Sequence, residues 1–578
     1  MTNSCQYGTI VPYWNDRSVL TKICQTGVSN MNKKSIMSGI VSVLALGLSF
    51  SVLGDVDENH GVHENNDLSE HKYQKHTFKK LKRMANAMGG FDKILSFEGM
   101  KFSSNGSRVE PEQSFKPGGE PLFVQSYNYT LINSFTDQRS RTEWLHDSDF
   151  PLTTTRHFTE VINGRQGAVF GFDTVIAPPQ APMLSTRLGA RVKQNLLSSP
   201  LALIHRASRY ADKIRYSGIV KFKQRPHHVV TIPGWDQPIR LFIDVKSMLP
   251  VKADTLEDDS VYGDTRWEVF YSNWVEVGDI KLPSQLIHKI NGREINRETR
   301  DAFYLSEKLN AESFFIPAEL QAGFNADQFA WGIRSSQWFN RTVAFGIPFD
   351  LDQRTAAALN IVEVAPKVFH ARALTHNSMI IEMDDYLIVA EAPLYDERAQ
   401  VLLAAIETRW PDKSVKYLLS THFHNDHIGG VRGFANTGAT LIVGEGTKEH
   451  YQTLFDASHT VFPDTFARHP HEMEIKTVEA GEDLLITDGK RRVRIFDVTN
   501  RHSTGMLLAF VEDANLVFVS DLYNPEFFPM TVPQQFLSWS VDLLNALQHS
   551  PLDIRRIVGG HGGVSSYDEF VNQIESSL

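Results

Sequence analysis

Apolar runs of strand length recur through the C-terminal third of the chain, and residues that can bind a metal ion follow them. The runs cover residues 415–420, 492–499, 516–520 and 554–558. Short runs of this kind, alternating or continuously apolar and bounded by turn-forming residues, are typical of β-strands. Four strands would therefore deliver candidate ligands, and we expect those ligands to meet at one edge of a sheet.

The first run leads into a cluster of metal-binding side chains. Residues 421–430 read Thr-His-Phe-His-Asn-Asp-His-Ile-Gly-Gly and include His422, His424, Asp426 and His427. Zinc binds imidazole nitrogen at about 2.0–2.1 Å and carboxylate oxygen at a similar distance, so these closely spaced donors can share one or two ions. A solitary histidine would more often be an ordinary loop or core residue, whereas this spacing predicts a metal site.

One further candidate ligand follows each of the other three runs. His502, Asp521 and His561 each stand within a few residues of a run's end, and His561 has two glycines on either side. Glycine permits the positive φ angles that bring a backbone close to a site. Alone, each of these residues would be read as an ordinary loop residue or, for Asp521, as a helix N-cap. Together and in this order, they predict further ligands of the same site.

From about residue 360 to the C-terminus, the chain resembles the metallo-β-lactamase superfamily, whose ordered motifs are HxHxDH, a His, an Asp and a final His. All seven positions are filled. The resemblance implies an α/β (α+β) fold, a four-layer αββα sandwich over residues 359–578, with two metal ions. Zinc is the predicted metal, although spacing alone does not separate it from iron or manganese. By the same resemblance, the first ion would be held by His422, His424 and His502, and the second by Asp426, His427 and His561, with Asp521 bridging both.

Two further positions concern the surroundings of this site. Glu391 ends an apolar run where many superfamily members have an aspartate that braces the metal loop. We expect Glu391 to brace the loop instead, because outer carboxylates orient ligating imidazoles. His376 and Asn377 stand just before another strand and are predicted to contact the substrate, with an ordinary turn as the alternative.

The predicted reaction is hydrolysis. Two divalent ions about 3.5–4 Å apart can share a hydroxide and polarise the bond that it attacks. The resemblance makes Asp426 the catalytic residue that manages the proton of this water. Within the superfamily, a bridging aspartate such as Asp521 belongs to glyoxalase II, lactonase, phosphodiesterase and related groups, whereas true zinc β-lactamases usually lack it. The prediction is therefore cleavage of an ester, thioester or lactone. The alternatives are a zinc β-lactamase and a lipid- or ligand-binding protein with a non-catalytic metal domain.

Composition narrows the class of protein and its partners. At 578 residues the chain needs two or more domains, and its 42% hydrophobic and 22% charged residues are typical of soluble globular proteins. A net charge of −10 supplies no basic field for a polyanion, so we expect a small-molecule substrate and no nucleic acid. Cys5 and Cys24 are the only cysteines, which excludes a disulfide framework in the remainder.

The N-terminal residues predict export. An uncharged apolar run, residues 36–53, follows Asn32-Lys33-Lys34, which predicts a signal peptide over residues 31–54 and a periplasmic or secreted bacterial protein. The run is almost long enough to cross a bilayer, so an uncleaved membrane anchor is the alternative. We interpret residues 1–30 as an upstream extension before a start at Met31, and the polar residues 55–70 as disordered.

A β-rich accessory domain is predicted over residues 71–305. Residues 72–88 predict a helix that ends at Gly89-Gly90, and residues 183–210 predict helices broken at Ser199-Pro200. The runs that predict strands are residues 94–102, 124–135, 154–163, 168–172, 214–222, 228–232, 239–245, 265–272 and 280–289.

Residues 241–255 and 261–283 resemble the half-barrel domains of bacterial lipoprotein carriers. The resemblance implies an antiparallel sheet whose concave face can hold an acyl or lipid ligand, with Phe270, Tyr271 and Trp274 as candidate contacts. The alternative is that these aromatic residues fill the core. Residues 306–358 contain many aromatic residues, which predicts a segment docked onto a domain and not a free linker.

Overall fold

A computed structural model describes residues 77–174, 178–346, 352–527 and 530–578, all of which belong to one compact unit. The predicted upstream extension, signal peptide and disordered stretch lie outside these residues. Within the described ranges, no helix has the length and apolar character needed to cross a membrane.

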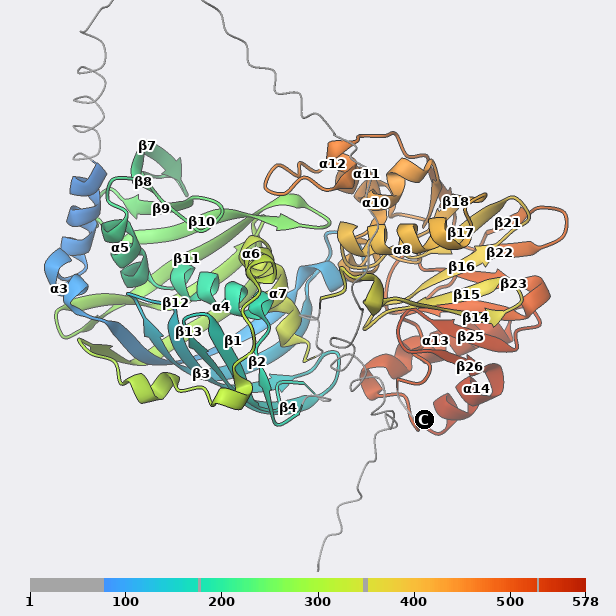
Figure 1. Cartoon of the computed structure of the whole chain (residues 1–578), viewed down its shortest axis with the longest axis horizontal. Coiled ribbons are helices and arrows are strands. Elements are labelled where there is room, and N and C mark those ends of the chain that lie inside the picture. The colour runs from blue at the N-terminus through green and yellow to red at the C-terminus, as the bar shows by residue number, and fades with distance from the viewer. Residues whose placement is uncertain (1–76, 175–177, 347–351, 528–529) are drawn as a thin grey trace, which may run out of the picture. The chain divides into compact units, whose positions relative to one another are not determined.

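The N-terminal region contains a 13-stranded antiparallel sheet (Figure 1). Its strand order is β6-β5-β4-β3-β2-β1-β13-β12-β11-β10-β9-β8-β7, so β1 pairs directly with β13. The strands are β1 Gly99–Glu110, β2 Leu122–Ser134, β3 Arg139–Ser148, β4 Thr154–Asn163, β5 Gln166–Gly171, β6 Gln180–Pro182, β7 Arg215–Phe222, β8 Arg225–Ile232, β9 Ile239–Asp244, β10 Pro250–Asp259, β11 Gly263–Val277, β12 Ile280–Ile290 and β13 Arg293–Ser306. The β-rich domain predicted from the sequence is thus present.

One predicted strand begins later than expected. Helix α3 (Phe91–Ser96) occupies the first part of residues 94–102, and β1 starts only at Gly99. Phe91 and Ile94 are both buried, and residues three apart share one face of a helix. A short apolar stretch fits either structure, and here packing selects the helix.

Helices α4 (Ser185–Leu197) and α5 (Pro200–Arg209) lie over the sheet, and the described residues 77–87 are also helical (Figure 1). The predicted helix break at Ser199-Pro200 is confirmed. Ser199 caps α5 by accepting a hydrogen bond from the Ala202 amide, and proline is well suited to the first helical turn.

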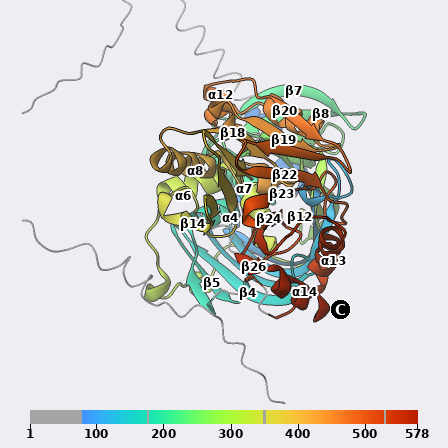
Figure 2. The same cartoon turned by 90° about the vertical axis from the view of Figure 1, so that its right-hand side faces the viewer.

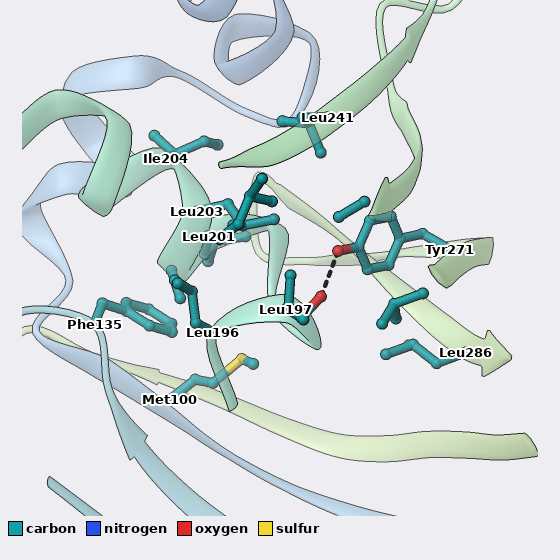
Figure 3. Close-up of a cluster of buried hydrophobic side chains, with 14 of the residues drawn as sticks. Met100, Phe135, Leu196, Leu197, Leu201, Leu203, Ile204, Leu241, Tyr271 and Leu286 are labelled. Carbon is teal, nitrogen blue, oxygen red and sulfur yellow. Dashed lines mark hydrogen bonds between the residues drawn. The ribbon is translucent and has the colours of Figure 1, made fainter. Parts of the chain in front are cut away.

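The interface between these helices and the sheet is a large apolar core. In Figure 3, Tyr271 donates a hydrogen bond to the Leu197 carbonyl, amid side chains such as Leu196, Leu201 and Leu241. Tyr271 thus fills the core between β11 and α4. Its neighbour Phe270 is half-buried and stacks on Phe222 with 6.0 Å between the ring centroids. An acyl or lipid ligand in this domain stays a prediction.

The segment after β13 packs against α4. It contains α6 (Ala326–Arg334) and α7 (Ser336–Ala344). The backbones of α6 and α4 approach closely, because a Cβ on Gly332 would lie 1.9 Å from the Thr186 carbonyl oxygen. Trp331 and Phe339 meet edge to face with ring centroids 4.8 Å apart, so aromatic packing also joins α6 to α7.

The C-terminal region has two sheets enclosed by helices. The first has the order β14-β15-β16-β17-β18-β19-β20, and the second β21-β22-β23-β24-β25-β26. Helix α8 lies on one side of the strands, and α13 with α14 on the other (Figure 2). The predicted αββα sandwich is confirmed. Its strands are β14 Asn360–Ala365, β15 Val368–Arg372, β16 Ser378–Glu382, β17 Tyr386–Ala390, β18 Ser414–Leu419, β19 Thr440–Gly444, β20 Ile475–Val478, β21 Asp483–Thr487, β22 Arg492–Asp497, β23 Leu507–Val511, β24 Leu516–Ser520, β25 Arg556–Gly559 and β26 Val564–Ser566, and its helices are α8 Asp396–Arg409, α9 Asn425–Ile428, α10 Val431–Phe434, α11 Lys448–Asp456, α12 Thr465–Arg468, α13 Gln534–Gln548 and α14 Tyr567–Glu575.

Parallel pairing in both sheets determines where the loops meet. Strands β17 and β18 are parallel, and Ala390 pairs with Leu419 at their ends. Strands β24 and β25 are also parallel, and Ser520 pairs with Gly559. The carboxyl ends of parallel strands fall at the same edge of a sheet, which is where α/β folds place their sites.

Candidate metal centre

The structure brings all seven predicted ligands together. His422 and His424 lie in the loop after β18, and Asp426 and His427 lie in α9, which follows that loop. The other three ligands follow β22, β24 and β25 and are His502, Asp521 and His561. Gly562, next to His561, has a φ of +72°, as expected from the glycine-rich sequence.

The first donor set contains His422, His424, His502 and Asp521, which offer donor atoms within 4.8 Å of one another. The Nε2 atoms of His422 and His502 are 3.2 Å apart. Asp521 Oδ2 lies 3.4 Å from His502 Nε2 and 3.9 Å from His422 Nε2. This is the set that the sequence predicts for the first ion.

The second donor set contains Asp426, His427 and His561 and shares Asp521 with the first. Asp521 Oδ1 is 3.0 Å from His427 Nε2 and 3.2 Å from His561 Nε2. His427 Nε2 is in turn 3.7 Å from Asp426 Oδ2. Asp521 therefore presents one oxygen to each set, as a bridging ligand does.

Three of the histidines are anchored through the ring nitrogen that faces away from the centre. His427 Nδ1 donates to Glu391 Oε2 at 2.9 Å, and His561 Nδ1 donates to the Thr375 carbonyl at 2.7 Å. His424 Nε2 donates to the Ser114 carbonyl at 3.1 Å. Such bonds fix the tautomer and aim the other nitrogen's lone pair into the site.

The geometry fits metal ions. His424 Nδ1, His427 Nε2 and Asp521 Oδ1 are buried atoms without a hydrogen-bond partner among the described residues. Buried polar atoms normally have a hydrogen-bond partner. A metal ion would supply the missing partner for these three atoms. Tetrahedral ligands at 2.0–2.1 Å from an ion would be about 3.3–3.4 Å apart, close to the separations in both sets.

The electrostatics also favour bound cations. Burial lowers the pKa of His424 to about 3, so its imidazole is neutral and able to ligate at neutral pH. Burial alone would lower the pKa of His427 too, but Asp521, Glu391 and Asp426 raise it well above its usual value. These carboxylates stabilise a positive charge beside His427. A bound metal cation can supply that charge in place of a proton.

Glu391 connects three segments around the centre through hydrogen bonds. Besides His427 Nδ1, it accepts hydrogen bonds from the hydroxyls of Thr421, at 2.6 Å, and Ser520. Its side chain is completely buried, and both Glu391 and Ser520 have positive φ angles, at 68° and 51°. Strained backbone of this kind clusters at functional sites. The contacts agree with the bracing role predicted for Glu391.

His376 and Asn377 lie beside the second donor set. His376 Nε2 is 3.1 Å from Asp426 Oδ2, and a His376 ring nitrogen can join the group of Asp426, His427 and His561. Asn377 donates through Nδ2 to the Gly562 carbonyl at 3.0 Å and supports the His561 loop. Both side chains are buried, so these contacts serve the metal loops, and substrate contact stays a prediction.

Two contributions to the centre were not predicted. Trp539 of α13 packs on His502 with 4.1 Å between ring centroids. Residues 112–115, in the loop between β1 and β2, contact the loops that carry His424, Asp426 and His502. These residues lie more than 300 positions before the ligands, and nothing in their local pattern signals a metal site.

Comparison with known proteins agrees with this description of the C-terminal domain. The family model of the metallo-beta-lactamase superfamily matches residues 371–561. Among curated proteins, no match is found.

Solved structures also show similarity. A metallo-beta-lactamase from Pontibacter korlensis is 15% identical, covering 38% of this chain and 97% of its own, with a TM-score of 0.30. The DIM-1 metallo-beta-lactamase exposed to ceftazidime is 13% identical, covering 38% and 95%, with a TM-score of 0.29. The family match, together with the αββα fold, shows that residues 371–561 form a metallo-β-lactamase superfamily domain.

Proposed function

We propose that the C-terminal domain is a metal-dependent hydrolase that uses two ions to cleave an ester, thioester or lactone. The observation that supports this proposal is the position of Asp521, whose oxygens face two separate donor sets. A structural zinc site normally closes at four ligands, whereas seven donors joined by one carboxylate suit a pair of ions.

The residues that would hold the ions are those of the two donor sets. When bound, two divalent ions lower the pKa of a water between them toward neutrality and polarise the bond under attack. Imidazole and carboxylate donors suit zinc, and iron or manganese accept the same donors. Glu391, Thr375 and Ser114 would keep the imidazoles aimed at the ions.

Side-chain exposure indicates the direction from which a substrate would approach. The side chains of His422 and His427 are completely buried, whereas those of Asp426 and His561 are 16% and 19% exposed. We therefore expect substrate over Asp426 and His561. Asp426 is then the carboxylate placed to take up and release a proton, while the bond to His376 Nε2 fixes its orientation.

Metal analysis combined with a substrate panel tests the proposal. The purified protein should contain two ions per chain and hydrolyse at least one ester, thioester or lactone, and a chelator should abolish turnover until zinc is restored. β-Lactams belong in the same panel, since they test the alternative substrate class. Fewer than two ions per chain would contradict the two-ion centre.

A substitution in the first donor set tests the catalytic assignment. His422→Ala should weaken binding of the first ion and lower turnover together, because it removes one of the three imidazoles of that set. His471→Ala, at an exposed histidine of the same domain, is the matched control and should keep both. Undiminished hydrolysis by His422→Ala would refute the assignment.

A further inference from the structure

The loop between β1 and β2 of the β-rich domain lies against the metal centre of the C-terminal domain. It begins with a 3-10 turn (Pro111–Gln113). The Ser114 carbonyl accepts the hydrogen bond from His424 Nε2, and the Phe115 carbonyl accepts one from the amide of Thr504, two residues after His502. The loop therefore contacts two ligand-bearing segments through its backbone.

Gln113 makes the side-chain contact with the second donor set. Its Nε2 donates to Asp426 Oδ1 at 2.8 Å and lies 3.3 Å from Asn425 Oδ1. The other oxygen, Asp426 Oδ2, is the one near His376 Nε2 and His427 Nε2. With Oδ1 held by the Gln113 amide, Oδ2 remains oriented toward the donors of the second set.

A buried network holds this loop in place. Arg341 of α7 donates to Glu110 Oε1 at 2.6 Å and to Glu112 Oε2 at 2.8 Å. Glu112 Oε2 also accepts from Asn425 Nδ2 at 2.5 Å, which ties the loop to the residue before Asp426. Hydrogen bonds from a charged donor such as the Arg341 guanidinium are roughly twice as strong as neutral ones. Gln113 is thus carried by a firmly anchored turn.

We propose that Gln113 is a positioning residue of the metal centre, supplied by the β-rich domain, and that it orients Asp426 for the second ion. The role in catalysis rests on the proposed hydrolase function, whereas the role in ion binding does not. Removing an outer-shell partner of a ligand typically costs about 10–100-fold in metal affinity or activity. Because the side-chain bonds of Gln113 in the described structure go to Asn425 and Asp426, the loss should fall on one ion.

Gln113→Met in the full-length chain tests the proposal, because methionine keeps the length of the side chain and removes the amide donor. We expect stepwise removal of zinc by a competing chelator to show about 10–100-fold weaker binding of one ion and unchanged binding of the other. On a hydrolysed substrate, kcat should fall while KM stays the same, which indicates loss of an interaction specific to the transition state.

Two further variants complete the test. Gln113→Ala should match Gln113→Met, and Lys116→Ala, at an exposed position of the same loop, should leave both ion affinities unchanged. Wild-type ion binding in Gln113→Met, or equal weakening of both ions, would overturn the proposal. If two ions bind but no substrate is cleaved, the hydrolase proposal fails, and the ion affinities still decide the role of Gln113.

Discussion

Two buried carboxylates, Glu160 in the β-rich domain and Asp521 in the metal centre, have different surroundings. Glu160 accepts a hydrogen bond from Trp144 Nε1 at 2.9 Å and pairs with Arg187 and Arg191 at 2.8 and 2.9 Å. Asp521 faces imidazole nitrogens at 3.0–3.4 Å, and its Oδ1 has no partner in hydrogen-bond geometry among the described residues.

The two carboxylates differ in whether the neighbouring side chains can donate a hydrogen bond to them. Indole and guanidinium groups always carry N–H donors, so Glu160 is satisfied by the protein alone. The imidazoles of His427 and His561 already donate through Nδ1, so Nε2 meets Asp521 with a lone pair unless the ring gains a proton. A buried carboxylate among lone pairs is costly, and a cation between them removes the cost. This distinguishes a structural cluster from a ligand cluster.

The largest expected effect follows from removing the bridge. Asp521→Ala should take a ligand from both donor sets, so we expect loss of at least one ion and of more than about 100-fold in turnover, beyond the range for an outer-shell residue. Metal content and kcat measure both. Asp553→Ala, at an exposed aspartate of the same domain, is the control. Full metal content with normal turnover in Asp521→Ala would remove the distinction drawn between the two carboxylates.

Substitution of the other carboxylate, Glu160, should lower the stability of the fold and leave metal binding unchanged. Glu160→Gln keeps the side chain's size but leaves the buried Arg191 without a carboxylate partner, whereas Arg187 keeps its ion pair with Asp173. An uncompensated buried charge of this kind costs about 3–5 kcal/mol of unfolding free energy. Urea unfolding measures this loss, and zinc content should stay at the wild-type value. Glu143→Gln, on the same hairpin and half exposed, should change little. A stable Glu160→Gln protein that lost zinc would argue against a purely structural role.

The ligands could be predicted from the sequence because their signals are local. Each of the four loops follows a recognisable strand, and parallel pairing places the ends of β24 and β25 side by side. Even the replacement of the usual aspartate by Glu391 could be assigned, because its place at the end of β17 is a property of one strand.

The remaining parts of the centre depend on tertiary contacts. Gln113 and Asp426 are 313 positions apart, and a glutamine in a turn carries no signal for a distant partner. Substrate contact by His376 and Asn377 stays a prediction. Their packing against Asp426 and Gly562 follows from how two loops fold together, which the local sequence does not show. The helix α3 likewise replaced part of a predicted strand because burial, not propensity, decided a short apolar stretch.

A smaller effect is expected one step outside the ligands. Glu391→Gln keeps the size of the side chain, but an amide in place of the carboxylate weakens the acceptor that fixes the His427 tautomer. We expect about 10–100-fold weaker metal binding, measured by chelator competition. Glu363→Gln, at an exposed glutamate of β14, serves as the control. Unchanged affinity would show that the histidine is oriented by packing alone.

The smallest effect, counted per pH unit, is expected from a change of pH. The metal centre and the Glu160 cluster should respond in different pH ranges. Ion binding needs neutral imidazoles, whereas nearby carboxylates raise the pKa of His427 well above its usual value and Asp521 raises that of His561, both against the effect of burial. Binding must therefore displace protons, and the affinity should fall about tenfold per pH unit for each proton displaced as the pH decreases.

The Glu160 cluster should respond only in stronger acid. Burial would raise the pKa of Glu160, but Arg191 and Arg187 lower it from 4.5 to about 2. A carboxyl with a lowered pKa stabilises the fold fully above its unfolded value and loses this contribution as the pH falls through the folded value. Chelator competition and circular dichroism between about pH 8 and pH 5 should therefore show zinc release from a folded protein. Two outcomes would contradict the contrast between Asp521 as a ligand and Glu160 as a structural residue. They are a zinc affinity that does not depend on pH, and unfolding at the same pH as zinc release.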